Sequence, residues 1–392
     1  MGGFARRAWR LHTTLAGGTE AGVVPESVFD LLVSQVSSLT TSVVVPVYNG
    51  EQYLPRCLDA LLSSSIPQLE IIVVDDGSDD RSAAIAEAKG VVLIRTGSRS
   101  GPAHARNRGA AAARGDILVF IDADVVVHPD TLEKILVAFT TRPDLHALMG
   151  SYDSDPSERS LISRYKNLFH HYVHQHGRER ALTFWAGCGA VRRLTYLKLG
   201  GMNEAYDRPS IEDIELGYRL YQAGFRCELR KDVQATHLKR WTLRTLIRTD
   251  LFCRAIPWTE LMLRLRLYPD DLNFSYAQKI STLLALALPC AALASFFNRA
   301  ALAAFLGLGG AFIWLNRDLY RFFYAHGGVR LAAAAVPLHW LYSVYSALGF
   351  GIGSLRHLVG KVSGKPAVFI SSLRSDSSSG TESVPTMRGS SE

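Results

Sequence analysis

The sequence predicts an α/β fold, with a Rossmann-like, mostly parallel sheet covered by helices and a C-terminal α-helical membrane region. Two observations carry this prediction. In residues 41–140, short β-branched runs alternate with longer segments of helical spacing, which is the order typical of parallel sheets. Residues 280–297, 300–316 and 331–355 contain no charged side chain. Such lengths match the roughly 17 to 25 residues that a helix needs to cross a hydrocarbon core.

The expected elements of the sheet domain follow one another regularly along the chain. The expected strands are residues 42–47, 70–74, 91–95 and 117–121, and the expected helices are residues 51–62, 81–89, 103–114 and 129–139. Sheets of this kind bind ligands at the carboxyl ends of their strands. Polar clusters follow the first, second and fourth strands, so we expect the functional site at that edge.

Composition excludes several classes of protein. The 392 residues are 48% hydrophobic and 20% charged, with a net charge of +7, which fits neither a small disulfide-stapled module nor a disordered chain. The five cysteines are widely spaced without a C-x-x-C pair, so we expect reduced thiols. Nucleic acid is not expected as a partner, because no recognition fold accompanies the excess cations.

The chain divides into five parts. We expect a leader (1–40), a globular domain (41–240), an amphipathic segment (241–279), a membrane region with two or three spans (280–357), and a Ser-rich disordered tail (371–392). Arg240, Arg244 and Arg248 recur every fourth residue, which predicts an interfacial helix; a helix packed on the globular domain is the alternative. The N-terminus lacks an apolar signal-peptide core, so the globular domain is expected in the cytoplasm of a multi-pass protein of the cell membrane.

Asp122 and Asp124 follow the expected strand 117–121. Two carboxylates one residue apart at a strand end repel each other unless a cation lies between them, and oxygen ligands suit Mg²⁺ or Mn²⁺. A solvated turn with a helix cap is the alternative interpretation of an isolated D-x-D.

Two further clusters suggest contacts with a nucleotide. In the run 75–80, Asp76 is a candidate acceptor of hydrogen bonds from a nucleobase or ribose, whereas other acids of the run can cap a helix. In the segment 101–109, Arg106 either neutralises phosphate or belongs to a solvated helix face. The chain has no P-loop and no dinucleotide-binding glycine motif after a strand.

Glu212 and Asp213 begin an expected helix. The helix dipole favours an ionised carboxylate there, which suits a general base. A capping box between Ser210 and Asp213 is the structural alternative. His170 and His174 would share a helix face, for which we favour a solvated or acceptor-facing helix over a zinc site.

Together these motifs resemble the family 2 glycosyltransferases of GT-A fold. The resemblance covers about residues 41–240 and rests on motifs that appear in the family's order, namely Pro46-Val47-Tyr48-Asn49, Val74-Asp75-Asp76-Gly77-Ser78, Gly101 with Ala105-Arg106-Asn107, Asp122-Ala123-Asp124 and Glu212-Asp213. It implies a nucleotide-sugar donor (UDP- or GDP-sugar), a divalent metal on the D-x-D motif and inversion at the anomeric carbon by one displacement.

The resemblance also implies roles for single residues. Pro46, Tyr48 and Asp76 would line the nucleoside pocket, Asp122 would contact ribose or the donor sugar, and Asp124 would ligate the metal. Asp213, beside Glu212, would take the proton from the acceptor hydroxyl.

On the acceptor side, Gly187 falls in the segment 184–193, which looks like the family's acceptor-binding stretch; an ordinary Gly-rich strand before a helix is the alternative interpretation. Residues 237–241 stand where processive members carry Q-x-x-R-W, which would place Arg240 on the diphosphate and Trp241 against the acceptor sugar. Here His237 replaces the Gln. His237 is either a late metal ligand, as in some non-processive members, or a departure from the processive motif.

We therefore expect a membrane-anchored glycosyltransferase that acts on a lipid-linked or glycan acceptor near membrane lipids. A processive polysaccharide synthase is the second hypothesis, and a non-catalytic nucleotide-sugar-binding membrane scaffold is the third. Intact Asp122, Asp124 and Asp213 argue against the scaffold.

Overall fold

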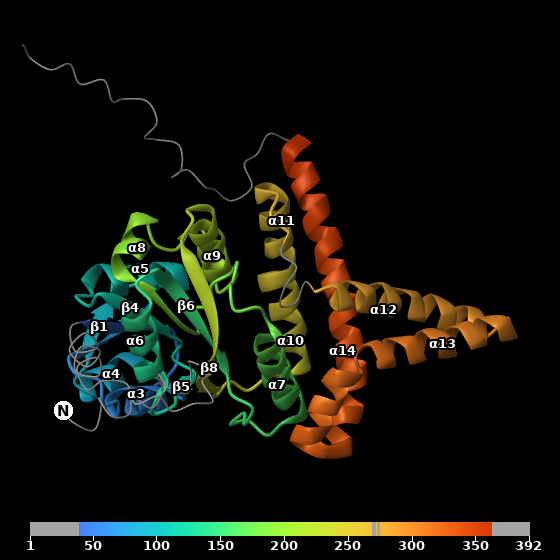
Figure 1. The fold of residues 1–392 in the computed structure, drawn as a ribbon, viewed down its shortest axis with the longest axis horizontal. Coiled ribbons are helices and arrows are strands. Elements are labelled where there is room, and N and C mark those ends of the chain that lie inside the picture. The colour runs from blue at the N-terminus through green and yellow to red at the C-terminus, as the bar shows by residue number, and fades with distance from the viewer. Residues whose placement is uncertain (1–38, 269–271, 273–274, 363–392) are drawn as a thin grey trace, which may run out of the picture.

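The computed structural model describes residues 39–268, 272 and 275–362 (Figure 1). The leader 1–38 and the tail from residue 363 lie outside the described residues, so the expectation of a disordered tail is not addressed. The first elements alternate as the sequence predicts: β1 (Thr41–Val47), α3 (Leu54–Leu62), β2 (Leu69–Asp75), α4 (Ser82–Ala88), β3 (Val92–Arg95), α5 (Pro102–Ala112) and β4 (Ile117–Ile121).

The rest of the sheet domain is less regular. It contains β5 (Val125–Val127), α6 (Thr131–Thr141), β6 (Leu145–Tyr152), α7 (Leu161–His176), β7 (Cys188–Arg192), α8 (Arg193–Lys198), α9 (Glu212–Gln222) and β8 (Arg226–His237). The strand order is β3-β2-β1-β4-β7-β6-β8-β5. β7 runs antiparallel to β4 and β6, and β5 runs antiparallel to β8. The sheet is therefore mixed and mostly parallel, which confirms the expected fold class.

The valine side chains of β1 pack against helices on both faces of the sheet. Val43 and Val45 pack in one core cluster with Leu58 of α3, whereas Val44 packs in the other with Ala105 of α5. A strand covered on both faces needs a continuous apolar run rather than an alternating one. This explains why the sequence has consecutive valines at this position.

The C-terminal helices dock onto this domain (Figure 1). They are α10 (Leu243–Arg248), the π-helical segment η1 (Thr249–Ala255), α11 (Ile256–Leu265), α12 (Tyr276–Ser295), α13 (Arg299–Leu315) and α14 (Arg317–Val362). One apolar cluster joins Phe169 of α7 to Tyr345 of α14, and another joins Tyr218 of α9 to Trp258 of α11. The expected interfacial segment thus packs on the globular domain, while Arg240, Arg244 and Arg248 stay exposed.

The three uncharged runs fall in α12, α13 and α14. Within the described residues, α12 and α14 are long and apolar enough to cross a membrane, and α13 is a shorter apolar helix. In Figure 1, α12 and α13 form a hairpin that projects from α14. The long helix α14 is interrupted at Gly328, whose φ of 67° suits glycine. The number of spans stays a prediction.

Candidate active site

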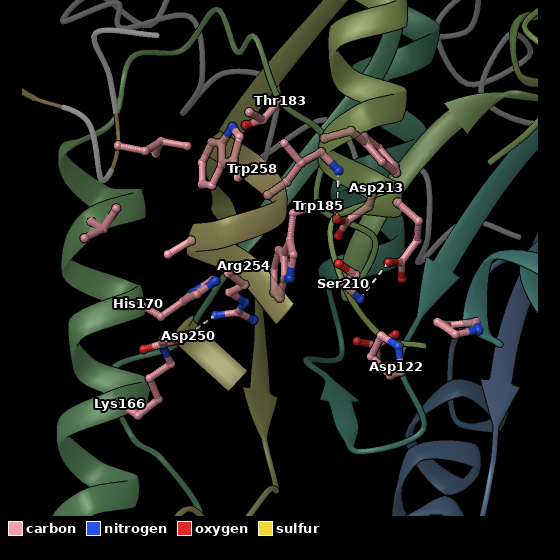
Figure 2. A pocket seen from close by; sticks show the side chains of 18 of the residues that line it. Asp122, Lys166, His170, Thr183, Trp185, Ser210, Asp213, Asp250, Arg254 and Trp258 are labelled. Atoms are coloured by element: carbon pink, nitrogen blue, oxygen red, sulfur yellow. Dashed lines mark hydrogen bonds and ion pairs between the residues drawn. The ribbon is translucent and has the colours of Figure 1, made fainter. Parts of the chain in front are cut away.

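A large cavity lies at the carboxyl ends of β1, β2 and β4, where the sequence predicts it. Its volume is about 1160 Å³, which is larger than the roughly 300 to 1,000 Å³ of a typical ligand pocket. Pro46, Tyr48, Asp76, Asp122 and Asp124 line one part of the wall, and side chains of α7, η1, α11, α12 and α14 line the other. Figure 2 shows Asp122 on one side of this cavity and Lys166 and His170 of α7 on the other. The space is sufficient for two substrates.

Tyr48 and Asp76, which the resemblance assigns to the nucleoside pocket, both line the cavity. The guanidinium of Arg99 lies 4.2 Å from the centre of the Tyr48 ring. The Asp76 carboxylate accepts hydrogen bonds from the backbone N–H groups of Ser100 (3.0 Å) and Gly101 (2.7 Å). Asp76 is 4% exposed and in this structure fixes the loop before α5, while its expected contact with a nucleoside stays a prediction.

Arg106 links two of the predicted site residues. Its Nη2 donates to Oδ1 of Asp122 (2.7 Å), and its Nη1 donates to Oε1 of Glu212 (2.9 Å). Arg106 is 5% exposed, which overturns the alternative of a solvated face. Burial alone would lower the pKa of Arg106, but Asp122 and Glu212 raise it above its usual value. Glu212 also accepts from the Ser210 N–H (2.9 Å) and therefore has a positioning role.

Asp213 presents its carboxylate to the same cavity. Oδ2 accepts from the Ala186 N–H (3.1 Å), and Oδ1 accepts from the Ile214 N–H (2.8 Å). Burial, reinforced by the charge of Glu212 and opposed by Arg106, raises the pKa of Asp213 to about 6. The dipole was expected to favour the ionised form, but burial outweighs it. The capping box is absent, because α9 begins after Ile211 and Ser210 bonds to the Cys253 carbonyl instead.

Asp124 and His237 form the candidate metal pair. Nδ1 of His237 lies 2.7 Å from Oδ1 of Asn167, and an amide oxygen can only accept. In the neutral ring Nδ1 therefore carries the proton, and the lone pair of Nε2 faces Oδ2 of Asp124 at 3.5 Å. Two electron pairs directed at each other suit a cation between them, and this orientation of a ligating imidazole is the usual one in metal sites.

The pair fits a divalent ion that also binds phosphate. Within the described ranges, no group of three or more His, Cys, Asp or Glu side chains is placed to hold a metal, and Asp122 is turned towards Arg106. Mg²⁺ is commonly held by one or two protein ligands together with substrate phosphates. Asp124 and His237 would supply the protein ligands, and diphosphate oxygens would supply the others.

The expected acceptor residues lie away from the cavity wall. A Cβ on Gly187 would come 2.5 Å from the Trp185 ring, so the glycine makes room for that indole, and Trp185 itself lines the cavity. Trp241 is 5% exposed and lies beneath Lys239, whose Nζ is 4.8 Å from its ring centre. Arg240 is exposed. None of Gly187, Arg240 and Trp241 lines the cavity.

Among the histidines of α7, His171 and His174 are buried, His170 is half-buried and His176 is exposed. Nδ1 of His174 lies 3.0 Å from the Gly150 carbonyl, and His170 and His174 line the cavity beside Trp185. Their acceptor-facing role, one of the two favoured interpretations, stays a prediction. Lys166, Asp250 and Arg254 also line this part and were not singled out from the sequence. One feature of the sequence could have singled out Arg254: it follows Arg248 by six residues, and so departs from the four-residue spacing of the exposed arginines.

Comparisons with known proteins agree with the motifs. Residues 42–200 match the family model "Glycosyl transferase family 2". An uncharacterised glycosyltransferase of Haemophilus influenzae is 36% identical over 135 residues, which cover 32% of this chain and 54% of the relative. Glycosyltransferase GlyG of Streptococcus pneumoniae is 33% identical over 116 residues, which cover 28% of this chain and 38% of the relative. The chain thus spans about half or less of the length of these relatives.

A solved structure resembles the fold over most of the chain. The mannosyltransferase PcManGT from Pyrobaculum calidifontis, solved with GDP-Man and Mn²⁺, aligns over 92% of this chain and 96% of its own, with a TM-score of 0.50 and 18% identity. Asp213 and His237 lie beyond the residues matched by the family model. Residues 42–200 are therefore similar to the family 2 glycosyltransferases, and they lie in a GT-A-like fold that is followed by a helical C-terminal region.

Proposed function

We propose that this protein is a membrane-anchored, inverting glycosyltransferase that moves a sugar from a UDP- or GDP-sugar to a hydroxyl of a lipid-linked or membrane-proximal acceptor. One observation carries the proposal: Asp213 and Asp124, which is paired with His237, line a single cavity whose far wall is formed by the apolar C-terminal helices. The GDP-Man and Mn²⁺ bound by PcManGT are consistent with such a donor and metal.

Each half of the cavity has a distinct task in this reaction. Tyr48 and Arg99 flank the nucleoside, and Asp124 and His237 hold Mg²⁺ or Mn²⁺ against the diphosphate. The metal, when bound, neutralises the charge that develops on the leaving diphosphate. Arg106 keeps Asp122 and Glu212 in place, so that the donor sugar meets a fixed wall.

Asp213 is the proposed general base. The acceptor oxygen attacks the anomeric carbon as the bond from that carbon to the diphosphate oxygen breaks, and the hydroxyl proton passes to the Asp213 carboxylate. At neutral pH, a carboxylate whose pKa is about 6 is mostly ionised yet more basic than an ordinary aspartate. One displacement inverts the configuration.

The apolar helices support attachment to a membrane. Phe296 and Phe297, in the turn between α12 and α13, are 84% and 85% exposed, and Leu293 and Leu306 of these two helices are also exposed. Exposed apolar patches of this extent mark contact with lipid or with another protein. We place the glycosyltransferase domain on the cytoplasmic side, where the donor would be supplied.

The test is sugar transfer in membranes that contain the full chain, with Mn²⁺ or Mg²⁺ and a panel of radiolabelled UDP- and GDP-sugars. Wild type should label a lipid-extractable product, and Asp213→Asn should lose about 10² to 10⁴ of the rate. Asp155→Asn, which changes an exposed carboxylate outside the cavity, is the matched control. Equal rates for Asp213→Asn and wild type would refute the catalytic role, and donor binding without transfer would favour a scaffold.

A further inference from the structure

The acceptor half of the cavity contains more positive than negative charge. Lys166 of α7, Lys239 after β8 and Arg254 of η1 line it, and the neighbouring carboxylate is Asp250 of η1. Figure 2 shows Lys166, Asp250 and Arg254 on the side of the cavity opposite Asp122. The proposed transfer reaction assigns no task to these groups.

The Asp250 carboxylate already has hydrogen-bond partners. Its two oxygens accept hydrogen bonds from Lys166 Nζ, at 2.6 and 2.8 Å, and one of them also accepts from the Tyr345 hydroxyl of α14 at 2.8 Å. Arg254 Nη1 is more distant, at 3.5 Å from Oδ1. Asp250 and Lys166 are 6% and 10% exposed, whereas Arg254 is 40% exposed. The charges of Lys166 and Asp250 therefore nearly cancel, and the Arg254 guanidinium has N–H donors that can bind a ligand.

Lys239 adds to this excess of charge. In the described part of the chain it makes no ion pair, and its Nζ lies over the Trp241 ring. Burial, opposed by Asp250 and reinforced by Arg254 and Lys239, lowers the pKa of Lys166, so both of the other cations are close enough to repel Lys166. An excess of cations at a partly buried wall is stabilised by an anionic ligand.

The wall beyond these cations is apolar and partly exposed. Leu283 and Leu286 of α12 and Phe350 of α14 line the cavity and are 68%, 43% and 52% exposed, respectively. Phe169 of α7 also lines the cavity and packs in one apolar cluster with Tyr345 of α14. A ligand that satisfies both parts has a phosphate at one end and a hydrocarbon chain at the other.

We propose that Arg254, assisted by Lys239, binds the phosphate of a lipid acceptor whose hydrocarbon chain lies along α12 and α14. This inference rests on the proposed transfer reaction and specifies its acceptor as an anionic, phosphate-bearing lipid. Arg254 is near Asp213, since the charge of Asp213 helps to raise the pKa of Arg254 against burial. A phosphate held there would bring a nearby hydroxyl of the same lipid to the base.

The experiment measures binding to the full chain in phosphatidylcholine nanodiscs, followed by tryptophan fluorescence, since Trp185 and Trp258 line the cavity. The probes are dodecyl phosphate, dodecanol and inorganic phosphate, with empty nanodiscs as the blank. Dodecyl phosphate should bind about tenfold or more tightly than either of the other probes, because a charge-assisted hydrogen bond is lost with dodecanol and the apolar contact with phosphate.

Arg254→Gln should weaken the binding of dodecyl phosphate about tenfold and leave dodecanol unchanged. Arg244→Gln, which removes an exposed arginine outside the cavity, should behave as wild type. Lys239→Gln should weaken the binding in the same direction and serves as the second variant if Arg254→Gln does not fold. Equal binding of dodecanol and dodecyl phosphate, or no effect of either cavity variant, would overturn the proposal. Equally tight binding of inorganic phosphate would assign the site to a free anion.

Binding of the nucleotide sugar to the same samples separates this proposal from the proposed function. Arg254→Gln should bind the donor as wild type does if the phosphate site belongs to the acceptor. Loss of donor binding in Arg254→Gln would place the arginine on the donor diphosphate and overturn the inference. A wild type that binds dodecyl phosphate but transfers sugar from no donor would refute the proposed function and leave the lipid site standing.

Discussion

His237 is oriented by Asn167, whose Oδ1 lies 2.7 Å from the ring Nδ1. Asn167 comes from α7 and is 1% exposed, and Tyr152 stacks on the other side of the imidazole with a centroid distance of 4.3 Å. The ring is thus held with Nε2 towards Asp124. Because the partners of His237 lie far from it in the sequence, the folded domain and not the local segment determines how this histidine binds.

Replacement of Asn167 by Ala should weaken metal binding and leave the maximal rate of transfer unchanged. Loss of such a second partner typically costs about 10- to 100-fold in metal affinity. The measurement is the Mn²⁺ concentration that gives half-maximal transfer. Excess Mn²⁺ should restore the transfer rate of Asn167→Ala. Asn167→Asp retains an acceptor for Nδ1 and should therefore reach half-maximal transfer at a lower Mn²⁺ concentration than Asn167→Ala. A rate that stays low at every Mn²⁺ concentration would contradict this role.

The transfer rate should follow the ionisation of Asp213. A general base works when deprotonated, so kcat/KM at saturating donor should rise with pH, with a midpoint near the pKa of about 6, and level off above it. Glu212→Gln should move the midpoint to lower pH, because the charge of Glu212 helps to raise this pKa. The range from about pH 5 to about pH 7 extends roughly one unit to either side of the expected midpoint. A transfer rate that stays constant over this range would be incompatible with Asp213 as the general base.

Asp250→Asn should destabilise the protein. It leaves Lys166 buried without its counter-charge, which costs about 3 to 5 kcal/mol in comparable buried pairs. Although burial raises the pKa of Asp250, Lys166 and Arg254 lower it overall, so this stabilisation is present at neutral pH and is lost as the pH falls. Thermal unfolding of the solubilised full chain measures the effect. Asp318→Asn, in an exposed ion pair, should change little, and an equal change in the two variants would count against the prediction.

Gly349→Leu should loosen the contact between α14 and η1. A Cβ on Gly349 would lie 2.4 Å from the Ala255 Cβ, so a leucine forces the two helices apart. Overpacking of this kind costs about 1 to 3 kcal/mol. A lowered unfolding temperature and faster proteolysis between the two regions are expected. Gly310→Leu is the control, because a Cβ there meets no atom within 4 Å; similar unfolding temperatures for both variants would refute the proposed close packing.

The sequence predicts the first half of the sheet well. β4 has the predicted bounds, and β1 to β3 differ from theirs by a residue at one or both ends, because buried parallel strands carry continuous β-branched runs between clear turn signals. A Gly-rich strand before a helix was the alternative interpretation of residues 184–193, and β7 followed by α8 agrees with it, but its antiparallel direction was not predicted. Its pairing with β4 joins Cys188 to Ile121, and a contact of that sequence separation leaves no periodic pattern.

The sequence predicts which residues reach the site better than it predicts which partners they contact. Asp122, Asp124 and Asp213 reach one cavity as predicted, since strand ends and a helix start converge at that edge. The sequence does not reveal that Arg106 joins Asp122 to Glu212, or that burial outweighs the helix dipole at Asp213. Both effects depend on how deeply the groups are buried, which local spacing does not encode.

The π-helical turn of η1 changes the rotational phase of the helices on either side of it. Arg244 and Arg248 of α10 are exposed, whereas Arg254 at the end of η1 lines the cavity. One residue corresponds to about 100° of rotation in an α-helix, and a π-helical turn accommodates an additional residue. Deletion of a single residue from Thr249–Ala255 would therefore turn Arg254 away from the cavity while leaving the outward arginines where they are. The length of this seven-residue segment, as much as its composition, decides which cations face the substrate.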